Sequence, residues 1–152
     1  MMKRRSFLKR VAVVSSIGIT GLLNSSLALA EKHGNDPFKA KSLEEVLKIL
    51  GGIDAEVSDK IKLKAPEIAE NGAVVPVGVA SKIEGTTEIS LITVENPTPL
   101  AAKYLLGEGA VPSVKSRFKM GKTTDVVVLV KAGDKFYTTK ANVKVTKGGC
   151  GG

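Results

Sequence analysis

From residue 60 onward, the apolar residues of this 152-residue chain recur at every second position in a series of short segments. Ile61, Leu63 and Ala65, for example, alternate with Lys60, Lys62 and Lys64. A period of two places successive side chains on opposite faces of a β-strand, whereas a helix needs a period of about 3.6. Most of the chain is therefore expected to form strands rather than a helical bundle.

The predicted strands are separated by turn signals and lie at residues 60–65, 74–80, 86–95, 101–106, 113–120, 125–131 and 135–146. The segments 86–95 and 125–131 are apolar on both faces, and the second contains the unbroken aliphatic run Val126 to Val130. Such a run is typical of a strand that is covered on both sides, either inside a sandwich or by a partner protein. Gly133-Asp134 predicts a hairpin between the last two strands. Pro76 removes a ladder donor, which predicts an edge strand or a bulge at 74–80.

One helix is predicted before these strands. Ser42 and Glu45 have the spacing of a capping box, in which the hydroxyl and the carboxylate satisfy each other's backbone donors. Gly51-Gly52 ends the helix. The apolar positions between these signals share one helix face: Leu43, Val46, Leu47 and Leu50. About seven short strands with one short N-terminal helix predict an all-β, immunoglobulin-like β-sandwich, although the chain lacks the Cys-Trp-Cys core of true immunoglobulin domains.

The N-terminus has the features of a cleaved export signal. Arg4-Arg5 is followed by Phe7-Leu8, by a moderately apolar stretch at 11–23 that is too short to span a bilayer, and by Ala28-Leu29-Ala30. This arrangement resembles a twin-arginine signal, with a departure at Lys3, where Ser or Thr usually precedes the pair. An ordinary secretion signal is the alternative. We expect a twin-arginine-type signal peptide at residues 1–30, export to the periplasm, and no membrane anchor.

The export signal accounts for most of the basic character of the chain. The formal net charge is +8, but the first 30 residues hold five basic residues and no acidic ones. Residues 31–152 therefore keep 18 basic against 15 acidic residues, a net charge of +3. No arginine-rich run with interleaved aromatic residues is present, so nucleic acid is not an expected partner. Residues 31–147 have the size of one ordinary domain.

The last five residues, Gly148-Gly149-Cys150-Gly151-Gly152, contain the only cysteine of the chain. Glycine has no Cβ, so the backbone around Cys150 can reach conformations that are closed to other residues, and no neighbouring side chain widens the segment. An unpaired cysteine in an exported protein predicts either an intermolecular bond or a working thiol. We expect residues 148–152 to form a flexible arm that carries this thiol into the active sites of other proteins.

The remaining residues offer the thiol no catalytic machinery. One histidine, His33, and one cysteine cannot form a metal-ligand cluster, and His33 is expected to be an inert surface residue. Glycine-rich phosphate loops are absent from the sequence. The sequence therefore predicts a protein that is not an enzyme, binds no cofactor or metal, and serves as a protein-bound substrate of other enzymes.

A glycine-framed cysteine at the end of an exported β-domain resembles the SoxY family, the sulfur-carrier subunits of the periplasmic Sox thiosulfate-oxidising system. Further stretches agree with that family, namely residues 65–72 leading into 74–77, residues 96–101, and residues 119–121. The resemblance implies that sulfur intermediates bind covalently to Cys150 and that the chain pairs with a SoxZ-like subunit. It also implies a SoxAX-like c-type cytochrome complex that couples thiosulfate to the thiol, a SoxB-like thiosulfohydrolase that removes sulfate, and in some organisms a SoxCD-like sulfane dehydrogenase.

Two alternatives remain open. The terminal Gly151-Gly152 resembles the end of ubiquitin-like sulfur carriers, which are activated at the C-terminal carboxylate and have a β-grasp domain with a prominent crossover helix. A structural subunit that uses Cys150 only for a disulfide-linked dimer is the other. Length, the export signal and the strand-rich pattern argue against the first alternative. The position of a sulfur adduct, on the thiol or on the carboxylate, or its absence, distinguishes the three hypotheses.

Overall fold

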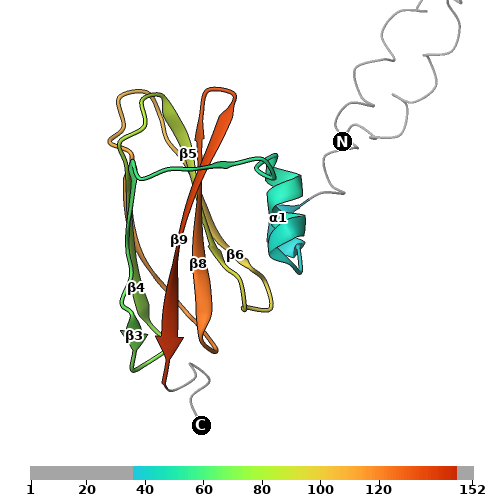
Figure 1. Cartoon of the computed structure of the whole chain (residues 1–152), viewed down its shortest axis with the longest axis vertical. Coiled ribbons are helices and arrows are strands. Elements are labelled where there is room, and N and C mark those ends of the chain that lie inside the picture. Colours follow the sequence, from blue (N-terminus) through green and yellow to red (C-terminus); the bar gives the residue numbers. More distant parts are fainter. Residues whose placement is uncertain (1–35, 147–152) are drawn as a thin grey trace, which may run out of the picture. The chain divides into compact units, whose positions relative to one another are not determined.

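The protein, described by a computed structural model over residues 36–146, forms an all-β, immunoglobulin-like sandwich with one α-helix (Figure 1). The chain divides into two units, Met1–Gly34 and Asn35–Gly152, and the described residues belong to the second. Its elements, in order, are the 3-10 turn η2 (Pro37–Lys39), α1 (Leu43–Leu50), β1 (Glu56–Val57), β2 (Ile61–Lys64), β3 (Ile68–Ala69), β4 (Val75–Ser81), β5 (Thr86–Thr93), β6 (Leu100–Leu105), β7 (Ser113–Phe118), β8 (Thr124–Ala132) and β9 (Lys135–Val145). All seven predicted strands are present, and the two-residue strands β1 and β3 were not predicted.

Two sheets face each other. The larger sheet has the strand order β1-β9-β8-β5-β6, and the smaller one has the order β2-β4-β7. As predicted, β8 and β9 form a hairpin, with Gly133 at a φ of 59° in the turn. Strands β1 and β3 both run parallel to β9 and pair near its two ends, at Tyr137 and Thr138 and at Lys144 and Val145. The chain between them, β2, pairs with β4 in the smaller sheet, so this part of the chain switches sheets twice.

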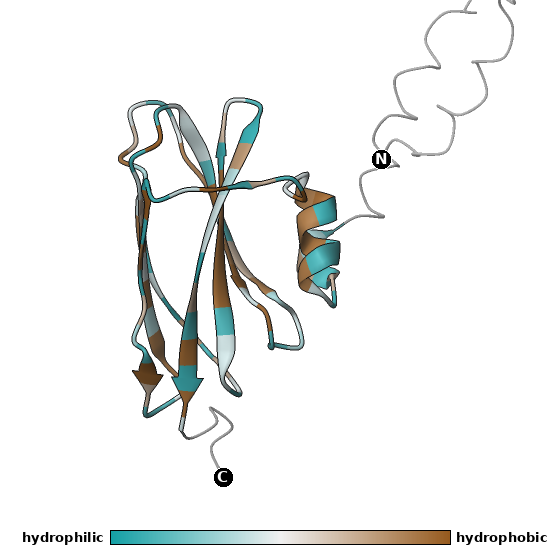
Figure 2. Cartoon of the chain, in the orientation of Figure 1, coloured by the Kyte–Doolittle hydropathy of each residue, from teal (hydrophilic) through white to brown (hydrophobic). Residues whose placement is uncertain are grey.

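The aliphatic run of β8 is buried by this chain on both faces. Val126, Val128 and Val130 belong to the core between the two sheets, whereas Val127 packs with Val46 in a second cluster beneath α1. Each aliphatic side chain buried in this way contributes roughly 1.5–3 kcal/mol. Figure 2 shows that apolar residues lie along the strands and on one side of α1. The sandwich therefore accounts for the whole run without a partner protein.

The helix begins and ends close to the predicted signals, with one correction. The backbone N–H of Glu45 donates to Ser42 Oγ at 3.1 Å, but the Glu45 carboxylate accepts from the backbone N–H of Lys41, at 2.8 Å, rather than from that of Ser42. The glutamate side chain is long enough to reach this amide, one residue further from the helix. Gly51 ends α1 with a φ of 80°, which is the left-handed conformation that glycine adopts readily.

The prediction of an edge strand or a bulge at Pro76 is wrong. β4 is the middle strand of the smaller sheet, and its register with β7 runs without interruption from Val75 to Ala80. β2 ends at Lys64, which lies opposite Gly78, so Pro76 has a strand neighbour only on its β7 side. A proline fits at this position because one side of β4 has no ladder there. Within residues 36–146, no helix is long and apolar enough to cross a membrane.

Candidate functional site

The residues of the predicted arm, Gly148, Gly149, Cys150, Gly151 and Gly152, lie outside the described part of the chain, as does His33. The last described residue is Thr146, which directly follows β9. The structure therefore describes the base from which the cysteine-bearing segment starts.

Two other segments of the chain accept hydrogen bonds from the end of β9 and hold it in place. β3 lies alongside the last two residues of β9 (Figure 1). Three backbone N–H groups donate here: Lys144 to the carbonyl of Glu67 at 2.9 Å, Val145 to Thr123 Oγ1 at 3.1 Å, and Thr146 to the carbonyl of Ala69 at 3.1 Å. Each bond contributes about 0.5–1.5 kcal/mol. These bonds fix the position of residue 146, four residues before the only thiol of the chain.

Segments far apart in the sequence meet at this end of the sandwich. The backbone N–H of Met120 donates to the carbonyl of Gly72 at 2.7 Å, and the side-chain amide of Asn96 donates to the carbonyl of Lys119 at 2.7 Å. The stretches 65–72, 96–101 and 119–121, on which the family resemblance rests, are therefore connected to one another by hydrogen bonds. The first of them also holds the end of β9 through Glu67 and Ala69.

Two kinds of reactive group are absent from the described residues. Because the only histidine and the only cysteine lie outside residues 36–146, this part of the chain holds no thiol–imidazole pair. It also holds no group of three or more His, Cys, Asp or Glu residues that could bind a metal ion. What this end of the fold does, within residues 36–146, is hold the end of β9 in place through hydrogen bonds to two other segments.

A family model described as "Sulfur oxidation protein SoxY" matches residues 47–150. This range covers more than half of the chain and ends at Cys150. The chain belongs to the SoxY family. No match is found among curated proteins.

One solved structure agrees with this assignment, and a second shares the fold. The chain is similar to the sulfur carrier protein SoxY from Chlorobium limicola f thiosulfatophilum, with 42% sequence identity and a TM-score of 0.64 over 71% of this chain and 95% of that chain. It also resembles the superoxide reductase (neelaredoxin) from Ignicoccus hospitalis, with 16% identity and a TM-score of 0.52 over 60% of this chain and 94% of that one. The second likeness shows the sandwich fold alone.

Sequence reasoning missed the residues that hold the base. Ala69 lies in a strand of only two residues, which is too short to show a period. Thr123 acts through its hydroxyl from the loop before β8, where threonine is unremarkable in sequence. The proximity of these residues to the end of β9 depends on strand register, which a single sequence does not display.

Proposed function

We propose that this SoxY-family protein carries sulfur intermediates covalently on Cys150 during thiosulfate oxidation and presents them to other enzymes. The observation that carries the proposal is the family match, which extends through the chain's only cysteine. The firmly bonded end of β9, five residues earlier, supports it as a suitable base for a carrier arm. The 42% identical relative from Chlorobium, which is named a sulfur carrier protein, supports the same role.

The proposed loading step is an oxidation. The Cys150 thiol and the outer sulfur of thiosulfate form a sulfur–sulfur bond, which releases one proton and two electrons to a SoxAX-like c-type cytochrome complex. A SoxB-like thiosulfohydrolase then adds water to the terminal sulfonate, so that sulfate and two protons leave and a persulfide anion stays on Cys150. A SoxCD-like sulfane dehydrogenase would oxidise that sulfur further. The protein itself supplies the attachment atom and no catalysis.

Reach and slenderness are what the arm contributes. Four residues beyond Thr146 can extend about 13–14 Å, at ~3.3–3.6 Å per residue. Such a segment can enter a deep, narrow channel while the folded body stays outside. Glycines lose more entropy on ordering than other residues, yet bulkier neighbours of Cys150 would be excluded by the channel. The steric advantage of a narrow segment therefore outweighs the larger loss of conformational entropy when its glycines become ordered.

We further propose that the protein works in the periplasm as a heterodimer with a SoxZ-like subunit. The twin-arginine-like start of the chain motivates the compartment, because it resembles an export signal. This export route is associated with folded cargo. A partner without its own signal, exported together with this chain, would explain why such a route is used. Purified periplasmic protein should contain both subunits in equal amounts, whereas a stable monomer in the presence of micromolar partner would contradict the heterodimer.

The fold favours thiol chemistry over activation of the C-terminal carboxylate. Within residues 36–146, the only α-helix precedes all strands and packs against the larger sheet. A β-grasp carrier would instead place its helix as a crossover between strands. A disulfide-linked structural dimer remains distinguishable by experiment, because it would not require thiosulfate.

Reconstituted thiosulfate oxidation tests the proposal. With the cytochrome complex, the thiosulfohydrolase and the SoxZ-like subunit present, Cys150→Ser should abolish thiosulfate-dependent cytochrome reduction while the fold is unchanged. Ser113 is exposed on β7, so the double variant Cys150→Ser/Ser113→Cys offers a matched control with a thiol on the folded body. It should not restore turnover. Activity in either variant would contradict the assignment of Cys150 as the carrier.

A further inference from the structure

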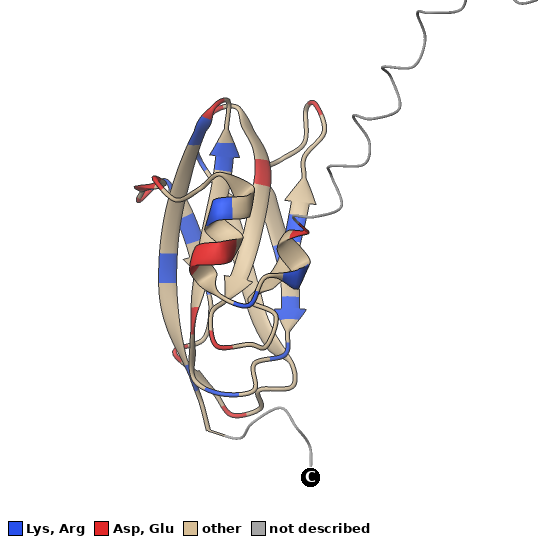
Figure 3. Cartoon of the chain, turned by 90° about the vertical axis from the view of Figure 1, so that its right-hand side faces the viewer, with Lys and Arg blue, Asp and Glu red and all other residues tan. Residues whose placement is uncertain are grey.

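The outer face of the smaller sheet is positively charged. Alternation along the three strands directs four basic side chains outward: Lys62, Lys64, Lys115 and Arg117. The outward positions of β4 between them are Pro76, Gly78 and Ala80, so the face contains no acidic residue. None of the ion pairs formed within residues 36–146 involves these four cations. By contrast, the side of the molecule that carries α1 has acidic and basic residues interspersed (Figure 3).

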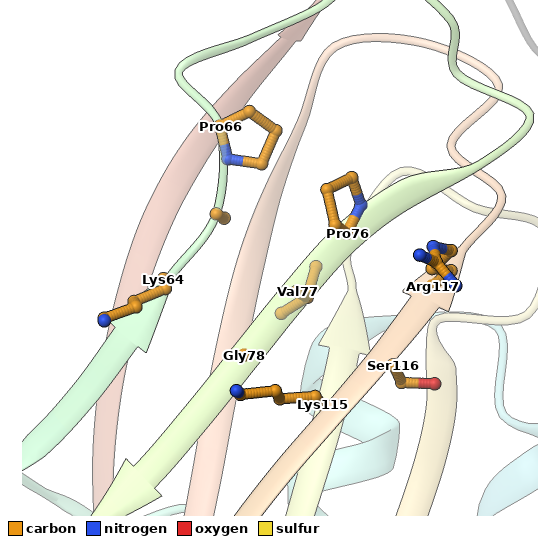
Figure 4. A pocket seen from close by; sticks show the side chains of 9 residues that line it. Lys64, Pro66, Pro76, Val77, Gly78, Lys115, Ser116 and Arg117 are labelled. Atoms are coloured by element: carbon orange, nitrogen blue, oxygen red, sulfur yellow. The ribbon is translucent and has the colours of Figure 1, made fainter.

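A shallow hollow lies over the central strand β4 of this face, towards the end of the sheet at which β2 and β7 end. Lys64, Gly78 and Lys115 form one row across the three strands, and Gly78 has no side chain to fill the space between the two lysines. A Cβ at Gly78 would lie 3.8 Å from Lys64 Cβ and 3.8 Å from Lys115 Cγ. Pro66 and Pro76 form an apolar wall, as Figure 4 shows. The hollow has a volume of about 710 Å³.

The hollow lies close to the base of the carrier arm. Pro66, in its wall, directly precedes Glu67, whose carbonyl accepts the hydrogen bond from Lys144 at the end of β9. Two apolar side chains in the adjoining segments are exposed: Ile68 in β3 is 57% exposed, and Val74, just before β4, is 55% exposed. Cations and apolar side chains are therefore gathered at the end of the molecule from which the arm starts.

Unneutralised cations on one face repel one another and are stabilised by an approaching surface of opposite charge. Two features favour a protein surface over a small anion as the ligand. The wall of the hollow is apolar, and the basic groups are exposed rather than built into a buried anion site. We propose that the outer face of the smaller sheet, centred on Lys64, Gly78 and Lys115, docks an acidic protein surface at the active-site entrance of the enzymes that process Cys150. This inference rests on the proposed carrier function and names the surface that positions the arm.

Charge reversal tests the proposal. Lys64→Glu/Lys115→Glu alters the outer face of the smaller sheet, called the docking face below. Lys41→Glu/Lys135→Glu is a matched control, with the same change in net charge at two exposed lysines outside that face. Association of each heterodimer with the purified thiosulfohydrolase is followed by stopped-flow measurements at rising salt. We expect the docking-face variant to associate at least about tenfold more slowly at low salt, with a flatter salt dependence, and the control to stay within about twofold of the wild type.

Equal slowing of the two variants would overturn the proposal, because it would show an effect of net charge alone. Failure of Lys64→Glu/Lys115→Glu to assemble with the SoxZ-like subunit would also overturn it, since the face would then be the heterodimer interface. The same rates are measured on chains carrying Cys150→Ser. If the wild-type chain docks with this salt dependence but never acquires a thiosulfate-derived adduct on Cys150, the docking face is supported and the carrier function is refuted.

Discussion

Replacement of Gly52 by alanine tests how closely the end of α1 is packed against the larger sheet. Gly52 is buried, and an added Cβ would lie 2.6 Å and 2.7 Å from the two methyl carbons of Leu129. Ordinary contacts between carbon atoms are about 3.5–4.0 Å. Leu129 is only 2% exposed, so its side chain must leave its rotamer or the end of α1 must move. Overpacking of this kind costs about 1–3 kcal/mol.

A second effect has the opposite sign. Alanine restricts the unfolded chain more than glycine does, which stabilises a protein by about 0.4–1 kcal/mol where the native backbone allows it. With both effects at the middle of their ranges, Gly52→Ala should lower the free energy of unfolding by about 1 kcal/mol. In a Leu129→Ala background the clash is gone, so the same substitution should be neutral or stabilising by up to about 1 kcal/mol.

Urea unfolding of the four chains in this double-mutant cycle measures both quantities. Gly107→Ala is a matched control, because its Cβ would meet nothing within 4 Å, and it should be neutral or slightly stabilising. If Gly52→Ala destabilises the protein equally with and without the Leu129 side chain, the requirement for glycine comes from the backbone, and the packing argument is refuted.

Further predictions concern the arm and the core. Gly148→Val/Gly149→Val should leave folding and thiol alkylation almost unchanged but lower turnover by the partner enzymes roughly 10- to 100-fold, because the widened segment no longer positions the thiol. Deletion of residues 147 and 148 should lower turnover similarly by shortening the reach about 7 Å; normal turnover of both arm variants would show that Cys150 is modified at an open surface. Val128→Ala, at a fully buried position between the sheets, should lower the free energy of unfolding by about 1.5–3 kcal/mol in urea without changing thiol alkylation, and a negligible loss would contradict its place in the core.

The sequence predicted the longer elements because each repeats a physical signal. Alternating polarity, or an aliphatic run bounded by turn signals, indicates a strand. The Ser42-to-Gly51 segment combines a cap, an apolar face and a stop signal. β1 and β3 escaped prediction since two residues cannot display a period, and backbone pairing with β9 holds them in place. The prediction at Pro76 was wrong because a central strand tolerates a proline where its neighbour has already ended, and the sequence does not show where β2 ends relative to β4.

The candidate site also combines a feature that is visible in the sequence with contacts that form only in the folded chain. Cys150 was predicted to be the attachment site because it is the only thiol and glycines surround it. It lies outside the described residues, so this stays a prediction. The base of the proposed arm could not be predicted, because the hydrogen bonds that Glu67, Ala69 and Thr123 accept join segments that meet only in the folded sandwich. The docking face likewise depends on register, which places Lys64 and Lys115 on either side of Gly78.

Intact-mass and fragmentation measurements on the protein, isolated from cells that are oxidising thiosulfate, test the central claim most directly. The proposed carrier function predicts sulfur adducts that a reductant removes and that fragmentation assigns to the Cys150 side chain, with none on a Cys150→Ser chain. Adducts on the C-terminal carboxylate, adducts that persist in the Cys150→Ser chain, or a reducible dimer as the only modified species would contradict it.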